Sequence, residues 1–186
     1  MRLPLLVTAG CMLLSSCGKQ SGDVPGPRAL SPRDIHLPGI AFYMTPEEVS
    51  GRLAGLRCEA PEKTIRVCTW SPDTRQDSFR GVSQLRLVFY RDSLHMISVR
   101  YAEMVDAEYV NFARAVREKY APALQAADSA GAQWIFDSVS VSLTPNRRRH
   151  WTGSIDTYAP VLEFQERVLY RRWLQEVSGQ KPKEVY

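Results

Sequence analysis

The feature that most constrains the fold is a strict alternation of apolar and polar residues in the C-terminal half. In SVSVSLT, residues 138–144, three serines alternate with Val139, Val141 and Leu143. Successive side chains of a strand point to opposite faces of a sheet, so this pattern predicts a strand with one face on a core and the other toward solvent. A similar alternation occurs in SQLRLVFY, residues 83–90.

Other strands and helices are expected on either side of these segments. Strand-like runs occur at residues 40–43, 64–70, 94–101, 133–136 and 157–165, and Pro160 predicts an edge or a break in the last of them. Apolar residues at helical spacing predict helices over 106–120, with Asp106 as N-cap, and over 166–179. In the last helix the residues expected to face the core are Leu169, Tyr170, Trp173, Leu174 and Val177.

A short helix is expected after residue 45. Thr45 is a good N-cap, Pro46 fits the first helical position, and Glu48 completes a capping box. Capping and the helix dipole therefore explain the acidic pair Glu47–Glu48 better than an acid–base site does.

These elements predict an α+β domain, an antiparallel sheet with short helices packed on one face. There is also an internal echo. A helix precedes Cys68-Thr69-Trp70 and then residues 85–94, and another helix precedes Ala132-Gln133-Trp134 and then residues 160–169. Two similar α+β halves could build one sheet in this way.

The first residues have the features of an export signal. Arg2 is followed by a short apolar stretch that ends at Leu14-Ser15-Ser16-Cys17, too short to span a bilayer. This ending resembles the lipobox of bacterial lipoproteins, which implies that Cys17 is lipidated and begins the mature chain. The predicted organisation is a signal peptide over 1–16, a flexible tether over 17–34, one domain over 35–179 and a tail over 180–186. The alternative is an ordinary signal peptide cut near Ser16, with Cys17 a free thiol.

The lipobox resemblance also implies a location. Several lipid chains on Cys17 would anchor the protein stably in a membrane. Gly18 stands where an Asp would imply retention at the inner membrane, so the outer membrane, facing the periplasm, is expected.

Export also changes how Cys58 and Cys68 are interpreted. In an oxidising compartment a close pair of cysteines most simply forms a structural disulfide. A metal site would need more ligands, and no histidine lies near either cysteine in the sequence. A redox pair normally has the spacing C-x-x-C, which these two lack.

The most unusual polar feature is a basic cluster with an aromatic neighbour: Arg147, Arg148, Arg149 and Trp151. Arginine suits phosphate geometry and tryptophan suits a membrane interface, so these residues are a candidate site for anions or an acidic partner. Outside the cytoplasm nucleic acid is not the expected partner. The competing interpretation is a solvated loop over residues 144–156 whose tryptophan packs back on the sheet.

No catalytic or cofactor motif accompanies these features. His36, His95 and His150 are widely separated, and no metal spacing, nucleophile elbow or phosphate loop occurs. We therefore expect no catalysis, no metal and no cofactor.

MTPEEVSGRL, residues 44–53, lies behind the lipobox and the linker. It resembles the start of small envelope lipoproteins of the SmpA/OmlA (BamE-like) type and of the related β-lactamase-inhibitor-like fold. The resemblance implies short helices on an antiparallel sheet, and a binding or assembly module whose partner is an envelope protein. The alternative it suggests is an inhibitor of a secreted or periplasmic enzyme.

Overall fold

The computed structural model describes residue 37 and residues 39–72, 81–128, 131–149 and 156–179. The expected signal peptide, the tether, the tail, Cys17 and Trp151 lie outside these ranges. Within the described residues no helix is both long enough and apolar enough to cross a membrane.

The chain forms two successive groups of elements and a final helix. The first group consists of α1 (Pro46–Ser50), β1 (Arg57–Cys58), β2 (Ile65–Trp70), β3 (Val82–Tyr90) and β4 (Ser93–Tyr101). The second begins with β5 (Met104–Val105), α2 (Asp106–Tyr120) and a 3₁₀ turn (Ala121–Ala123). It continues with β6 (Leu124–Asp128), β7 (Gly131–Ile135), β8 (Val139–Thr144), β9 (Arg147–Arg149), β10 (Asp156–Tyr158) and β11 (Val161–Glu166). The last helix is α3 (Arg167–Ser178).

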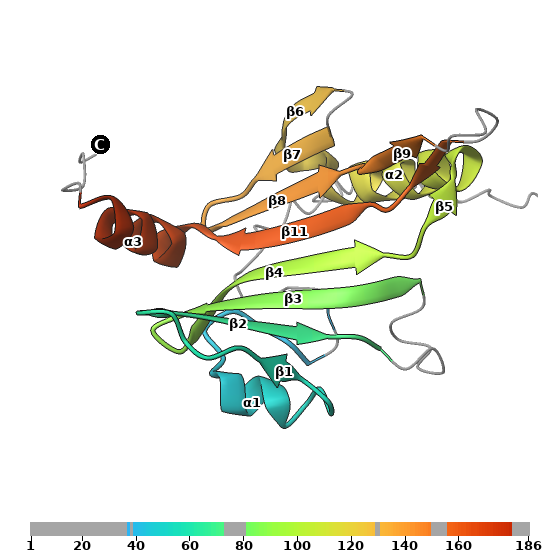
Figure 1. Cartoon of the computed structure of the whole chain (residues 1–186). Coiled ribbons are helices and arrows are strands. Elements are labelled where there is room, and N and C mark those ends of the chain that lie inside the picture. Colours follow the sequence, from blue (N-terminus) through green and yellow to red (C-terminus); the bar gives the residue numbers. More distant parts are fainter. Residues whose placement is uncertain (1–36, 38, 73–80, 129–130, 150–155, 180–186) are drawn as a thin grey trace, which may run out of the picture.

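Eight strands form one antiparallel sheet in the order β1-β2-β3-β4-β11-β8-β7-β6 (Figure 1). A second sheet has the strand order β5-β10-β9. In the chain, β5 follows β4, β10 precedes β11 and β9 follows β8, so the small sheet repeats the order β4-β11-β8 of the large one. The chain passes from β10 to β11 through Ala159 and Pro160, which confirms the break expected at this proline. The α+β class expected from the sequence is confirmed at this level.

The strand order is mirrored about the junction of β4 with β11. Each half contributes a helix and then four antiparallel strands, with β1 and β6 at the two edges. The cross-strand registers match as well, because Trp70 lies opposite Leu85 as Trp134 lies opposite Val141. The similarity between the two halves of the sequence therefore correctly predicted that β2, with Trp70, and β7, with Trp134, are equivalent strands. It wrongly matched residues 85–94 with 160–169, because the order of strands makes β8 the counterpart of β3.

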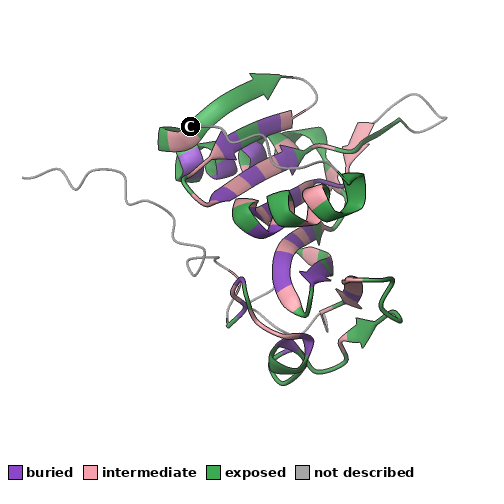
Figure 2. Cartoon of the chain, turned by 90° about the vertical axis from the view of Figure 1, so that its left-hand side faces the viewer, coloured by how far each residue is buried: buried purple, intermediate pink, exposed green. Residues whose placement is uncertain are grey.

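One face of the large sheet carries the main core. Buried and half-buried positions alternate along the strands, as the purple and pink bands of Figure 2 show. Val49 of α1 and Val116 of α2 belong to the same buried cluster as the strand residues, so both helices cover this face. The largest fully buried side chain is that of Trp134, whose ring lies 5.6 Å from that of Tyr120 on α2.

The third helix departs from the expectation that all helices pack on one face. Tyr90 follows the core residue Phe89 in β3, so its side chain points to the opposite face, where its hydroxyl donates a hydrogen bond to Glu176 of α3. In Figure 1, α3 continues past the end of β11. Its apolar stripe is only partly covered: Leu169 is buried, Tyr170 and Trp173 are half-buried, and Leu174 and Val177 are exposed.

Several local expectations were wrong. Residues 40–43 form no strand, because Tyr43 has φ 67° in a turn, although its N–H donates to Leu94 O at 2.9 Å. The N-cap of α2 is Val105, one residue before Asp106, and the Glu108 carboxylate accepts from its N–H at 3.2 Å.

The Thr45 capping box of α1 is present as expected, with reciprocal bonds of 2.8 and 3.2 Å.

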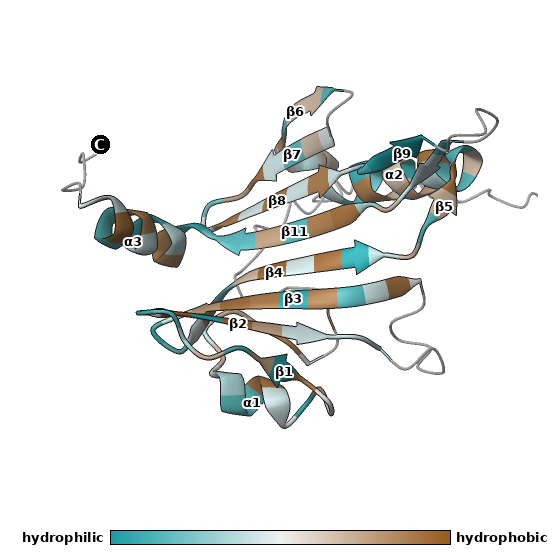
Figure 3. Ribbon diagram, viewed as in Figure 1, coloured by the Kyte–Doolittle hydropathy of each residue, from teal (hydrophilic) through white to brown (hydrophobic). Residues whose placement is uncertain are grey.

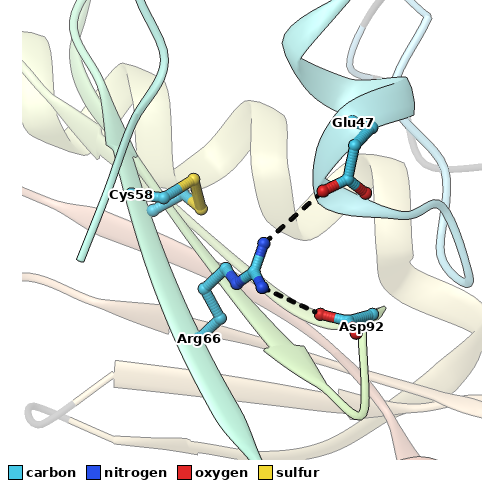
Figure 4. Close-up of a disulfide and its surroundings, with 5 residues drawn as sticks. Glu47, Cys58, Arg66 and Asp92 are labelled. Atoms are coloured by element: carbon cyan, nitrogen blue, oxygen red, sulfur yellow. Dashed lines mark ion pairs between the residues drawn. A yellow bond between two sulfur atoms is a disulfide. The ribbon is translucent and has the colours of Figure 1, made fainter. Parts of the chain in front are cut away.

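The edge of the first half is covalently closed. Cys58 of β1 and Cys68 of β2 lie directly opposite each other and form the disulfide expected from the sequence. Figure 4 shows Arg66 beside it, between Glu47 of α1 and Asp92 of the β3–β4 turn, at 3.5 and 3.4 Å. The disulfide fixes β1 to the sheet, and the ion pairs connect that edge to the helix and the turn.

Candidate functional site

The face of the large sheet opposite the core carries polar side chains beside a few apolar ones, Val67, Val88 and Met96. One row of directly paired residues crosses both halves from β2 to β7: Thr69, Arg86, Ser98, Glu163, Ser142 and Gln133. Each of these side chains is half-buried or exposed. We call this surface the open face. It is built on regular strands, so its polar groups keep fixed spacings.

Side-chain hydrogen bonds between neighbouring strands order part of the open face. The Ser98 hydroxyl donates to the Glu163 carboxylate at 3.0 Å, across the junction of the two halves. The hydroxyl of Ser140 on β8 donates to the Gln165 side chain on β11 at 3.4 Å. These bonds hold the central side chains in place, whereas Arg86 and Gln133 are exposed.

At one end the open face meets α3 and a buried histidine. His95 is 1% exposed, and its ring lies 6.2 to 6.5 Å from those of Tyr90, Tyr170 and Trp173. Neither imidazole nitrogen has a hydrogen-bond partner within the described residues, and burial lowers the pKa of His95 to about 4. This neutral, enclosed histidine is a packing residue between β4 and α3.

At the other end the open face reaches the arginine cluster. Arg147, Arg148 and Arg149 form β9, not the loop expected over residues 144–156, and they pair with β10. In Figure 3, β9 is the most hydrophilic strand of its sheet. Pairing with β10 displays the three arginines in fixed alternation, so they do not project together as a flexible cluster would.

Two of these arginines line a pocket with a residue from the large sheet. The pocket has a volume of about 320 Å³ and is lined by Arg100, Asn146, Arg147, Arg148 and Ala159. Arg100 is an exposed residue near the end of β4, on the open face. The sequence did not suggest Arg100, because only the strand order brings the end of β4 near the β8–β9 connection. Arg149 is not among the lining residues, and Trp151 lies outside the described residues.

The charges near the pocket are partly compensated. The Arg147 guanidinium donates to the Asp156 carboxylate, with Nε at 3.0 Å, and this bond raises the pKa of Arg147 above its usual value. Behind it, Tyr158 stacks on Tyr109 of α2 with ring centres 4.3 Å apart. A hydrogen bond to Asp106 raises the pKa of Tyr158. Asp156 therefore holds Arg147 in place and offsets its charge.

A second pocket lies at the β6 edge. It has a volume of about 240 Å³, and its lining comes from β6, β7 and β8, including Asp128, Gln133 and Ser142. Neither pocket is lined by His95. Within the described residues no group of three His, Cys, Asp or Glu side chains could hold a metal ion.

The remaining buried carboxylate has a structural role. Glu166 is fully buried at the end of β11, and its Oε2 accepts from the Leu169 N–H at 2.6 Å, which caps α3. Its position between strand and helix explains its burial. Burial and the neighbouring Glu166 carboxylate raise the pKa of the Tyr43 hydroxyl.

Comparison of the chain with protein-family models, with curated proteins and with solved structures finds no match. What the protein does is therefore inferred from its own residues.

Proposed function

We propose that this protein is a lipid-anchored binding or assembly module of the bacterial cell envelope, without catalytic activity. Its anchor is lipid on Cys17, and it faces the periplasm from the outer membrane. The lipobox-like ending at Leu14–Cys17 and Gly18 after it support this address.

The open face carries the binding role. It spans both halves of the sheet, keeps a polar row at fixed spacing, and meets α3 at the end near His95. Recognition sites held on rigid elements have better-defined geometry than sites on loops. A partner protein of mixed polar character, held across β3, β4, β11 and β8, is the occupant we expect.

Site-directed crosslinking in intact cells tests this role with two matched pairs of positions. A photoreactive residue replaces Arg86 or Gln133 on the open face, and in the controls it replaces Arg114 on α2 or Gln125 on β6. All four residues are exposed. A discrete adduct from the first two positions and none from the controls is expected. Equal adducts from all four, or none, would contradict the assignment.

The anchor is tested separately. Labelled palmitate should be incorporated into the native chain, and Cys17→Ala should lose the label and become extractable without detergent. Retention of label by the variant would disprove lipidation at this residue. If the captured partner is an enzyme that the purified chain inhibits, the protein belongs to the alternative class, the inhibitors of periplasmic enzymes.

A further inference from the structure

The pocket at the end of β4 brings together two arginines whose side chains have no partner in the part of the chain that the structure describes. Elsewhere in the described chain, Arg66 pairs with two carboxylates, Arg91 pairs with Glu176, and Arg167 donates to a backbone carbonyl at 3.2 Å. The side chains of Arg100 and Arg148 have no hydrogen bond or ion pair among the described residues, and both residues line this pocket. Two arginines without a side-chain partner in these ranges are thus available at one place for a ligand.

The backbone around the pocket is fixed. Asn146 has φ 44°, and it exchanges two hydrogen bonds with Ala159: its side-chain amide donates to the Ala159 carbonyl at 3.2 Å, and its carbonyl accepts from the Ala159 N–H at 3.3 Å. These bonds connect the chain on its way from β8 to β9 with the chain between β10 and β11. The positions from which Arg147 and Arg148 project are therefore set before any ligand binds.

The charge balance of the pocket indicates a doubly charged ligand. Three arginines line it, and the Asp156 carboxylate offsets the charge of Arg147, whose side chain points to the other face of β9 from that of Arg148. Among the described residues, the charges of Arg100 and Arg148 have no such partner. A carboxylate would neutralise one of them, whereas a phosphate monoester carries a charge of about −1.5 to −2 at pH 7.

The donor geometry points the same way. A guanidinium group presents several N–H donors in a planar fork that matches the oxygens of phosphate, often in pairs. Two arginines from different strands, Arg100 of β4 and Arg148 of β9, line the pocket. At about 320 Å³ the volume is near the lower limit for small-ligand pockets.

We propose that Arg100 and Arg148, with Asn146 and the Asp156-bound Arg147, form a binding site for the dianionic phosphate of a phosphomonoester. The group could belong to a soluble molecule or to a lipid headgroup, since the chemistry at the pocket is the same. The proposal does not depend on the partner-binding role of the open face.

Calorimetric titration of the full chain with inorganic phosphate at pH 7 and low salt tests the site. Saturable binding at one site is expected. Arg100→Gln and Arg148→Gln should each weaken it at least about tenfold, because each removes a charge-assisted contact. Arg86→Gln is the matched control: it removes an exposed arginine from the same face, outside the pocket, and should change affinity less than about twofold.

Three results would overturn the proposal. One is the absence of saturable phosphate binding at millimolar concentrations by a chain whose thermal midpoint is normal. Another is a loss in Arg86→Gln as large as that in the pocket variants, which would indicate diffuse attraction by surface charge. The third is equal competition by acetate, which would indicate a carboxylate site. Arg148→Lys separates charge from geometry, since it keeps the charge and should still weaken phosphate binding.

A vesicle arm distinguishes the two sources of the phosphate. The Cys17→Ala chain, which has no site for the lipid anchor, is mixed with phosphatidylcholine vesicles containing phosphatidic acid, a monoester, or phosphatidylglycerol, a diester. Binding to the first that requires both Arg100 and Arg148 assigns the site to a lipid headgroup. Phosphate binding without vesicle binding assigns it to a soluble phosphomonoester. Equal binding to both kinds of vesicle, unchanged in the arginine variants, would contradict a dianion-selective pocket.

Discussion

The two halves of the large sheet share one strand order and differ most at one connection. In the first half, β3 turns into β4 through Arg91 and Asp92, whose φ values of 49° and 57° suit a two-residue hairpin. In the second half, the corresponding connection from β8 to β11 contains β9 and β10 and carries the arginine pocket. The tight turn lies beside α3, and the long one carries Arg148, whose side chain has no partner among the described residues. The repeated scaffold thus has a stabilising contact at this connection in one half and an arginine-lined pocket in the other.

The largest effect should come from the core that the halves share. Trp134 is fully buried against Tyr120, so Trp134→Ala should lower the free energy of unfolding by about 3–5 kcal/mol. Urea unfolding followed by circular dichroism measures it. Trp70→Ala, the counterpart in the first half, should cost a similar amount. A transition that splits into two steps in either variant would show that the halves unfold independently.

The disulfide belongs to the first half alone. In the second half, Ala132 stands at the position equivalent to Cys68, and the residue paired with it is Ala127. Cys58→Ala removes an exposed side chain and the crosslink between residues ten apart, so it should cost about 2.5–3 kcal/mol through the entropy of the unfolded chain.

The native chain under reducing conditions is the control for that variant and should match it in urea unfolding. Stability unchanged by reduction would mean that β1 contributes nothing to the fold through this bond.

The histidine under α3 makes the first half sensitive to acid. Unfolded His95 takes up a proton near pH 6.5, whereas the folded residue, buried among rings, does so only near pH 4. The unfolded state binds more protons between these values, so stability falls as the pH drops through this window. Between pH 7 and pH 5 the loss should be about 2 kcal/mol.

His95→Phe keeps an aromatic ring in the cluster and should abolish that part of the pH dependence in urea unfolding at the two pH values. An equal slope in the native chain and the variant would contradict the burial of a neutral imidazole.

The smallest expected effect is a difference in the free energy of unfolding between variants of the two tryptophans. Trp70 Nε1 donates to the Ala54 carbonyl at 2.9 Å, whereas Trp134 Nε1 has no partner within the described residues. Beyond the common loss of ring volume, Trp70→Phe should therefore cost about 1 kcal/mol more than Trp134→Phe in urea unfolding. Equal costs would remove this distinction between the halves.

The sequence predicted best the elements whose pattern is local. The helix over residues 106–120 has the expected bounds, and the alternation of residues 138–144 matches β8 and its covered face. The pairing of Cys58 with Cys68 followed from their proximity and the inferred compartment. The sequence failed where a neighbour decides the structure. β6 is exposed along its whole length and has no apolar alternation, so it forms only because β7 pairs with it.

In the candidate site, too, the sequence predicts the local feature and misses what neighbouring elements decide. The arginines 147–149 stand out in the sequence, but their strand pairing does not, because three consecutive charged residues give no signal for a strand. Arg100 lies about fifty positions earlier, and only the order of strands brings it to the same pocket. Leu174 and Val177 fit a core stripe by spacing, yet α3 extends past the sheet and leaves them exposed.

The connection between β8 and β11 leaves the sheet at Thr144 and returns at Val161, and these two residues are direct partners in the ladder. An excursion that begins and ends at one paired position is modular: its length and sequence can change while the registers on either side stay the same. Changes in the excursion would therefore alter the pocket without rebuilding the sheet. Arg100 belongs to the sheet rather than to the excursion, so every such variant would inherit one guanidinium group at the site.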